Sequence, residues 1–135
     1  ATFVTVSPSG ELRPFASNLN PVPGAAIPNL VLARVGVGGS IDLFNNAGTV
    51  HLVGDVVGYF SPSSDVGLES LSPARLLDTR DGTGGRLGTL GPGESIDLQV
   101  TGRGGRTLRT GPNFSRVFFL MTASTCLNSA SVRPE

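Results

Sequence analysis

Short stretches of alternating or β-branched apolar residues recur along the chain, separated by turn-forming residues. The clearest is Ser-Ile-Asp-Leu-Phe at residues 40–44, in which every second side chain is apolar, as in a strand with one buried face. Similar stretches lie at residues 3–6, 30–35, 49–60, 75–78, 95–100 and 117–121. No segment shows a sustained helical period, so the pattern predicts an all-β fold of seven or eight short strands.

The spacing of these strands predicts an antiparallel β-sandwich similar to a jelly roll. A propeller-like or barrel assembly is the alternative that the same pattern leaves open. Completion of the sandwich by exchange of strands or half-modules between subunits is a further possibility. The apolar positions of the strands predict a core made of Val4, Val6, Leu30, Leu32, Ile41, Leu43, Leu52, Val56, Phe60, Leu77, Ile96, Leu98 and Phe119.

One short sequence, Ser-Ile-Asp-Leu, occurs twice, at residues 40–43 and 95–98. Each copy follows a segment that contains glycine. Four identical residues are a weak indication of an internal repeat, and two hairpins with similar requirements would explain them equally well.

Composition narrows the class of protein. The chain has 135 residues, of which 39% are hydrophobic and only 15% charged, which is typical of one folded domain and not of a disordered chain. Gly (19) and Pro (10) together supply about a fifth of the residues and limit long helices. No apolar run is long enough to span a membrane. Since the chain lacks an initiator Met and a signal sequence, we expect a fragment or a processed product.

The charges are unevenly distributed. All ten basic residues are arginines, and residues 1–100 hold five of them with nine carboxylates, a net charge of −4. Residues 101–135 hold five arginines and one carboxylate, a net charge of +4. This asymmetry favours attraction between parts of the chain or between copies as much as binding of an anionic polymer. Because the arginines are dispersed and no aromatic platform is evident, we do not expect nucleic-acid binding.

Two longer motifs stand out, Asp-Val-Val-Gly-Tyr-Phe at residues 55–60 and Pro-Ala-Arg-Leu-Leu-Asp-Thr-Arg at residues 73–80. With their flanking segments they resemble the two halves of a repeat module found in large secreted bacterial surface proteins, notably actinobacterial ones. In that family the second motif precedes the first, so this chain resembles the end of one module joined to the start of the next. The resemblance implies the following organisation: a half-module at 1–60, a linker at 61–70, a half-module at 71–125 and a disordered tail at 126–135.

The resemblance also implies a location and a role. A module of this family would be secreted to the cell surface and would act structurally or adhesively, with weak binding to glycan or the cell wall. Because each half-module presents a strand edge meant for a neighbour, we expect a homo-oligomer, in the simplest case a small ring. A single chain that closes on itself as a circular permutant is the alternative.

A second hypothesis is a small hydrolase of activated esters or phosphoesters, for which His51, the only histidine, is the candidate. Alternation along its strand places His51 and Asp55 on one face, about 13 Å apart at roughly 3.3 Å per residue, too far to share a metal ion. Several copies of His51 could bind Zn²⁺ at a symmetric subunit interface, or His51 could act with Cys126. The simpler interpretation is an imidazole held by one hydrogen bond.

The segment Asp-Thr-Arg-Asp-Gly-Thr-Gly-Gly at residues 78–85 offers Asp78 and Asp81 on a glycine-rich turn, a possible Ca²⁺ site. The alternative is a turn in which Asp78 pairs with Arg75 or Arg80. No Gly-x-Ser-x-Gly motif marks a nucleophilic serine. The carboxylates that could serve glycoside hydrolysis are Asp42, Asp55, Asp78 and Asp97.

Overall fold

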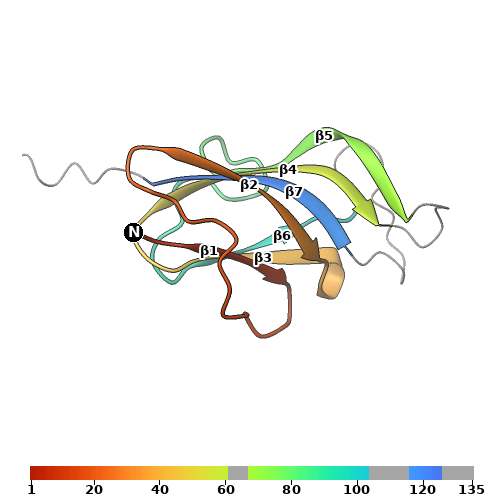
Figure 1. Ribbon diagram of the computed structural model, residues 1–135, viewed down its shortest axis with the longest axis horizontal. Helices are drawn as coiled ribbons and strands as arrows, with labels where there is room; N and C mark the ends of the chain where they lie inside the picture. The colour runs from red at the N-terminus through yellow and green to blue at the C-terminus, as the bar shows by residue number, and fades with distance from the viewer. Residues whose placement is uncertain (61–66, 104–115, 126–135) are drawn as a thin grey trace, which may run out of the picture.

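The computed structural model describes residues 1–60, 67–103 and 116–125 (Figure 1). Strand and bridge residues make up 57% of this part of the chain, which contains no α-helix. Two antiparallel sheets face each other and neither closes into a barrel. The predicted all-β sandwich is therefore confirmed, and the propeller-like or barrel alternative is wrong.

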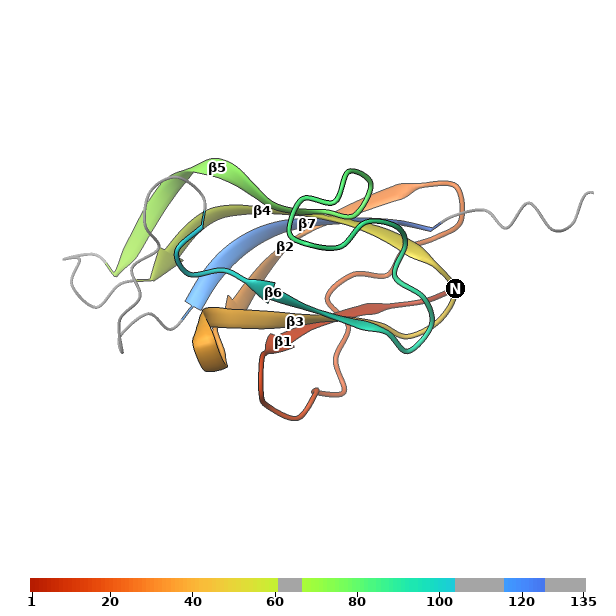
Figure 2. The same cartoon turned by 180° about the vertical axis from the view of Figure 1, so that it is seen from behind.

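Each predicted strand is present, and several are longer than the sequence pattern indicated. The smaller sheet has the order β1-β3-β6 and the larger sheet the order β2-β7-β4-β5, as Figures 1 and 2 show from opposite sides. The bounds are as follows: β1 (Val4–Pro8), β2 (Ala26–Arg34), β3 (Ser40–Asn45), β4 (Val50–Phe60), β5 (Leu68–Asp78), β6 (Ser95–Gln99) and β7 (Arg116–Thr125), with a single 3-10 turn, η1 (Val37–Gly39).

The two expected half-modules contribute to the same sandwich. β3 pairs with β6, and β4 pairs with both β5 and β7, so each sheet combines strands from both halves of the chain. Within the described residues the chain thus completes both sheets with its own strands. Residues 68–70, which we expected in the linker, already belong to β5, where Leu68 pairs with Phe60. The rest of that linker, residues 61–66, and the expected tail at 126–135 lie outside the described residues.

The core lies between the sheets and matches most of the predicted set. Ten of the thirteen predicted residues are buried, and the exceptions lie on β2 and at the end of β4. Leu30 and Leu32 are 56% and 50% exposed, whereas Val31 and Ala33 point inward. Their four positions are all apolar, so only the pairing of β2 with β7 decides which side chains face the core. Phe60 is half-buried and its ring lies 5.4 Å from that of Phe118.

Backbone geometry fixes the corner between the sheets and protects one edge. Gly39, between β2 and β3, has a φ of +81°, and a Cβ there would lie 1.9 Å from Thr101 Oγ1, so this corner requires glycine.

On the free edge of β1, Asn18 Oδ1 accepts a hydrogen bond of 2.7 Å from Val6 N, and Leu19 forms a bridge to Val4. The loop between β1 and β2 therefore covers an edge of β1 that would otherwise be open to pairing with another strand.

The described residues contain no helix that is both long and apolar enough to cross a membrane.

Candidate functional site

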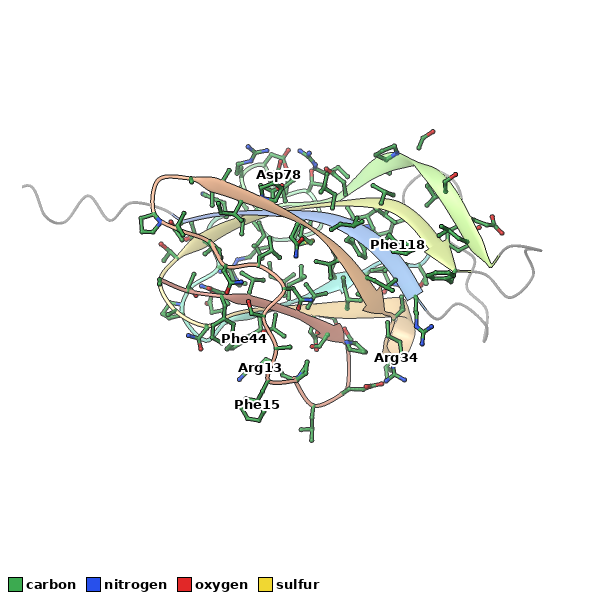
Figure 3. The ribbon with its side chains drawn as sticks, viewed as in Figure 1. Arg13, Phe15, Arg34, Phe44, Asp78 and Phe118 are labelled. Atoms are coloured by element: carbon green, nitrogen blue, oxygen red, sulfur yellow. The ribbon has the colours of Figure 1, made fainter. Side chains whose placement is uncertain are left out.

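Most of the candidate residues lie around the hairpin of β4 and β5, on the larger sheet. Alternate residues of β4 are buried, starting with Val50 and Leu52, so His51 and Asp55 share the outer face, as the sequence predicts. Asp78 ends β5, and Asp81 lies in the loop that follows. Figure 3 shows Asp78 on the side of the molecule opposite to Phe15.

The carboxylate of Asp78 is the centre of this cluster. Its side chain is 3% exposed and accepts four hydrogen bonds. Arg80 supplies three of them, from its backbone N at 3.0 Å, from Nε at 2.9 Å and from Nη2 at 2.7 Å. Arg75 Nη1 supplies the fourth at 3.0 Å. Both carboxylate oxygens are therefore occupied by cationic groups, which is the condition for burying a charge.

Arg75 extends the cluster across to β4. Its Nε and Nη2 donate to the two carboxylate oxygens of Asp55 at 2.8 and 3.2 Å, a bidentate contact. A bulge makes this contact possible, because the register shifts between Gly54 and Asp55 and sets Asp55 directly opposite Arg75. The residues Asp55, Arg75, Asp78 and Arg80 thus form a row of alternating charges, which we call the ion-pair row.

Contacts within the ion-pair row favour the charged forms of Asp78 and Arg75. Hydrogen bonds from Arg80 hold the pKa of Asp78 well below its usual range, against the opposing effect of burial. The hydrogen bond to Asp55 raises the pKa of Arg75 above its ordinary value. A general acid or base needs a pKa near the working pH, so these groups suit a structural role better than proton transfer.

Both proposed Ca²⁺ ligands accept hydrogen bonds from groups of the protein. Asp78 has no carboxylate oxygen to offer a cation without displacing an arginine, and Asp81 is exposed with its Oδ1 accepting a bond of 2.8 Å from Thr83 N. The geometry matches the alternative interpretation of this segment, a turn with Asp78 paired to both Arg75 and Arg80. In the part of the chain that the structure describes, no three His, Cys, Asp or Glu residues lie together as metal ligands would.

His51 is held by its neighbour on the hairpin. Its Nδ1 lies 2.9 Å from Thr79 Oγ1, and the same oxygen accepts a bond of 3.0 Å from Leu52 N. Asp55 is engaged with Arg75, so the structure does not bring His51 and Asp55 into contact as a catalytic pair. His51 thus has the single hydrogen bond of the simpler interpretation. Cys126, its other proposed partner, lies outside the described residues.

A second pair of carboxylates lies on the outer face of the smaller sheet. Asp42 of β3 and Asp97 of β6 stand directly opposite each other. Ser9 Oγ lies 3.0 Å from Asp42 Oδ1 and 3.4 Å from Asp97 Oδ1, but a hydroxyl has one proton and can serve only one of them fully. The sequence signal was the duplicated Ser-Ile-Asp-Leu: its two copies pair antiparallel and are centred on their aspartates.

Large apolar side chains are exposed on the larger sheet and on a loop beside the smaller sheet. On the larger sheet, Leu30 pairs with Leu120 and Leu32 with Phe118, and we call these four residues the apolar patch. Leu120 is 41% exposed, and both β2 leucines exceed that fraction.

Beside the smaller sheet, the loop after β1 leaves Leu12 and Phe15 almost completely exposed. Between these two residues, the guanidinium of Arg13 lies 3.5 Å from the centre of the Phe44 ring, which fixes the loop to β3 (Figure 3). The exposed side chains therefore belong to a loop that is anchored at its middle.

Comparison with known proteins adds no relative to this picture. No protein-family model matches the chain, and no curated protein or solved structure is detectably similar to it.

Proposed function

We propose that this chain is a structural and adhesive module of a secreted bacterial surface protein, and that it associates with copies of itself. The observation that carries the proposal is the exposure of large apolar side chains on the outside of a sandwich whose core is already buried between its sheets. A soluble monomer rarely exposes a contiguous apolar surface, and such a surface typically marks a contact with another macromolecule. The apolar patch and the loop residues Leu12 and Phe15 are surfaces of this kind.

The state of the polar groups supports a structural role. Asp78, the most buried of the candidate carboxylates, is saturated by arginines. Asp55 is held by the same network. Asp55 and Asp78 are thus committed to joining β4, β5 and the following loop. The motif resemblance at residues 55–60 and 73–80 supports the extracellular location and a cell-wall glycan as the surface partner.

Adhesion is tested by sedimentation with insoluble bacterial cell-wall glycan. We expect the purified protein to enter the pellet, and we expect the Leu12→Ser/Phe15→Ser variant to remain in solution more than the wild type, because both side chains are exposed without supporting the core. Leu87→Ser, which alters another exposed loop leucine, is the matched control. A protein that stays in solution, together with a mass of 13.8 kDa at every concentration, would contradict the proposal.

One observation favours the hydrolase as a second candidate. His51 is only partly buried, and its Nε2 has no hydrogen-bond partner among the described residues, so this nitrogen is open to a substrate or a metal ion. The assay compares hydrolysis of an activated ester and an activated phosphoester by the wild type and by His51→Ala. Turnover above background that is lost in the variant would favour the enzyme; equal background rates would reject it.

A further inference from the structure

We propose that copies of this chain stack head to tail, with the larger sheet of one copy against the smaller sheet of the next. The proposal rests on the self-association proposed above and names the surfaces that would carry it. The basic surface consists of Arg34, Arg116 and the apolar patch. The acidic surface consists of Asp42 and Asp97 together with the exposed loop residues Leu12 and Phe15.

The basic surface begins with two like charges. Arg34 of β2 and Arg116 of β7 stand directly opposite each other, at the end of the register that also pairs Leu30 with Leu120. Both arginines are exposed. Arg34 forms an ion pair with Glu11, whereas Arg116 has no ion pair among the described residues. Cationic charge and exposed leucines therefore lie side by side on the outer face of the larger sheet.

The acidic surface has a similar arrangement of residues and carries the opposite charge. Asp42 and Asp97 face each other across β3 and β6, and the Ser9 hydroxyl is the one hydrogen-bond partner of either side chain among the described residues. Asp97 is exposed and Asp42 half-buried. Leu12 and Phe15 are almost completely exposed. They belong to the loop that Arg13 fixes to the same sheet through Phe44. Anionic charge and exposed apolar side chains are again neighbours.

Complementarity between these surfaces makes a second copy the occupant. Like charges placed directly opposite on neighbouring strands destabilise a sheet, and each pair is relieved when the other approaches it. An arginine can also bind a carboxylate through two parallel hydrogen bonds. Because both surfaces belong to the same molecule but to different sheets, their contact is heterologous. Such contacts form a ring if the rotation closes and an open stack if it does not.

The test uses two complementary variants, each altered at one surface. The Asp42→Asn/Asp97→Asn variant removes the charges of the acidic surface and leaves the basic surface intact. The Leu30→Ser/Arg116→Ser variant weakens the basic surface and leaves the acidic surface intact. The wild type should form species larger than 13.8 kDa in light scattering at micromolar concentration, and high salt should weaken them. The association constant of each variant alone should be lower than that of the wild type by a factor of about ten or more, because close charge pairs contribute at least that much to binding. Circular dichroism verifies that both variants remain folded.

Mixing the two variants is the decisive step. Each provides the intact surface that the other lacks, so an equimolar mixture should form a one-to-one complex with a mass near twice 13.8 kDa. If the aspartate variant associates with itself as strongly as the wild type does, the contact joins two apolar patches and the head-to-tail arrangement is rejected. If the wild type associates and neither variant changes this, the surfaces are wrong but self-association stands. A monomeric wild type overturns both proposals.

Discussion

The two sheets of this molecule treat their aspartates in opposite ways. On the larger sheet, Asp78 is buried and receives four hydrogen bonds from Arg75 and Arg80. On the smaller sheet, Asp42 and Asp97 face each other and share the single hydroxyl of Ser9. The first arrangement neutralises its charge inside one chain. The second leaves two negative charges side by side at the surface.

This difference separates a carboxylate that stabilises the fold from carboxylates available to a partner. Burial of Asp78 is tolerated because cations fill both of its oxygens, so a ligand would have to displace them. Asp42 and Asp97 remain at the surface, where water screens their repulsion and a cationic group can approach. A cationic group that approaches Asp42 and Asp97 therefore does not have to displace an arginine.

The largest loss of stability is expected from a substitution in the core beneath Asp42 and Asp97. Leu43 lies next to Asp42 on β3 and is completely buried. Leu43→Ala should lower the free energy of unfolding by about 2–5 kcal/mol, because the cavity removes contacts on which the smaller sheet depends. Urea unfolding measures it, with Leu87→Ala, on an exposed loop, as the control. An unchanged midpoint for Leu43→Ala would mean that β3 presents its other face to the core.

The next largest loss of stability should separate a buried, paired aspartate, Asp78, from an exposed one. Asp78→Ala should lower the free energy of unfolding by about 1–3 kcal/mol, since it removes hydrogen bonds to a charged group. Asp81→Ala, in the same loop but exposed, is the matched control and should change stability little. Equal losses in the two variants would show that the ion-pair row contributes nothing beyond the turn.

The sequence pattern predicted much of the fold, and physical reasons explain where it stopped. Stretches of alternating or β-branched apolar residues identified every strand, but they could not orient β2, because residues 30–33 are apolar throughout. The apolar residues at 117–121 were enough to predict β7, which lies between β2 and β4 in the larger sheet.

The candidate site was harder to predict because its contacts depend on register. Pairing of Asp78 with an arginine was one of the alternatives, but its link to Asp55 required the bulge after Gly54. Asp42 and Asp97 were identified only as isolated carboxylates. That they face each other follows from the antiparallel pairing of two Ser-Ile-Asp-Leu copies, a relation between strands that no local pattern contains.

A pH series sharpens the comparison. The depressed pKa of Asp78 in the folded protein means that its ionised form stabilises the fold above the unfolded pKa of about 3.9. This contribution should decline as the pH falls below that value and should be lost when the pH passes the lowered pKa of Asp78 in the folded protein, where the carboxylate becomes protonated. The stability difference between wild type and Asp78→Asn should therefore be constant from neutral pH to about pH 5 and shrink in stronger acid. A difference that grows on acidification would contradict the assignment of the ion-pair row.

The smallest change in stability concerns Asp42 and Asp97, and it should be a gain where the other substitutions cause a loss. Asp97→Asn keeps the shape of the side chain and removes one of two like charges that face each other, so the monomer should gain about 0.2–1 kcal/mol of stability. The gain should shrink as salt is added, because screening already weakens the repulsion in the wild type. Ser95→Ala, also exposed on β6, is the control for a change at the same strand. Unfolding is measured at a dilution where the chain is monomeric, so that lost self-association does not mask the gain. A loss as large as that of Asp78→Ala would mean that Asp97 is held by a cation within the chain, and the contrast between the two sheets would fail.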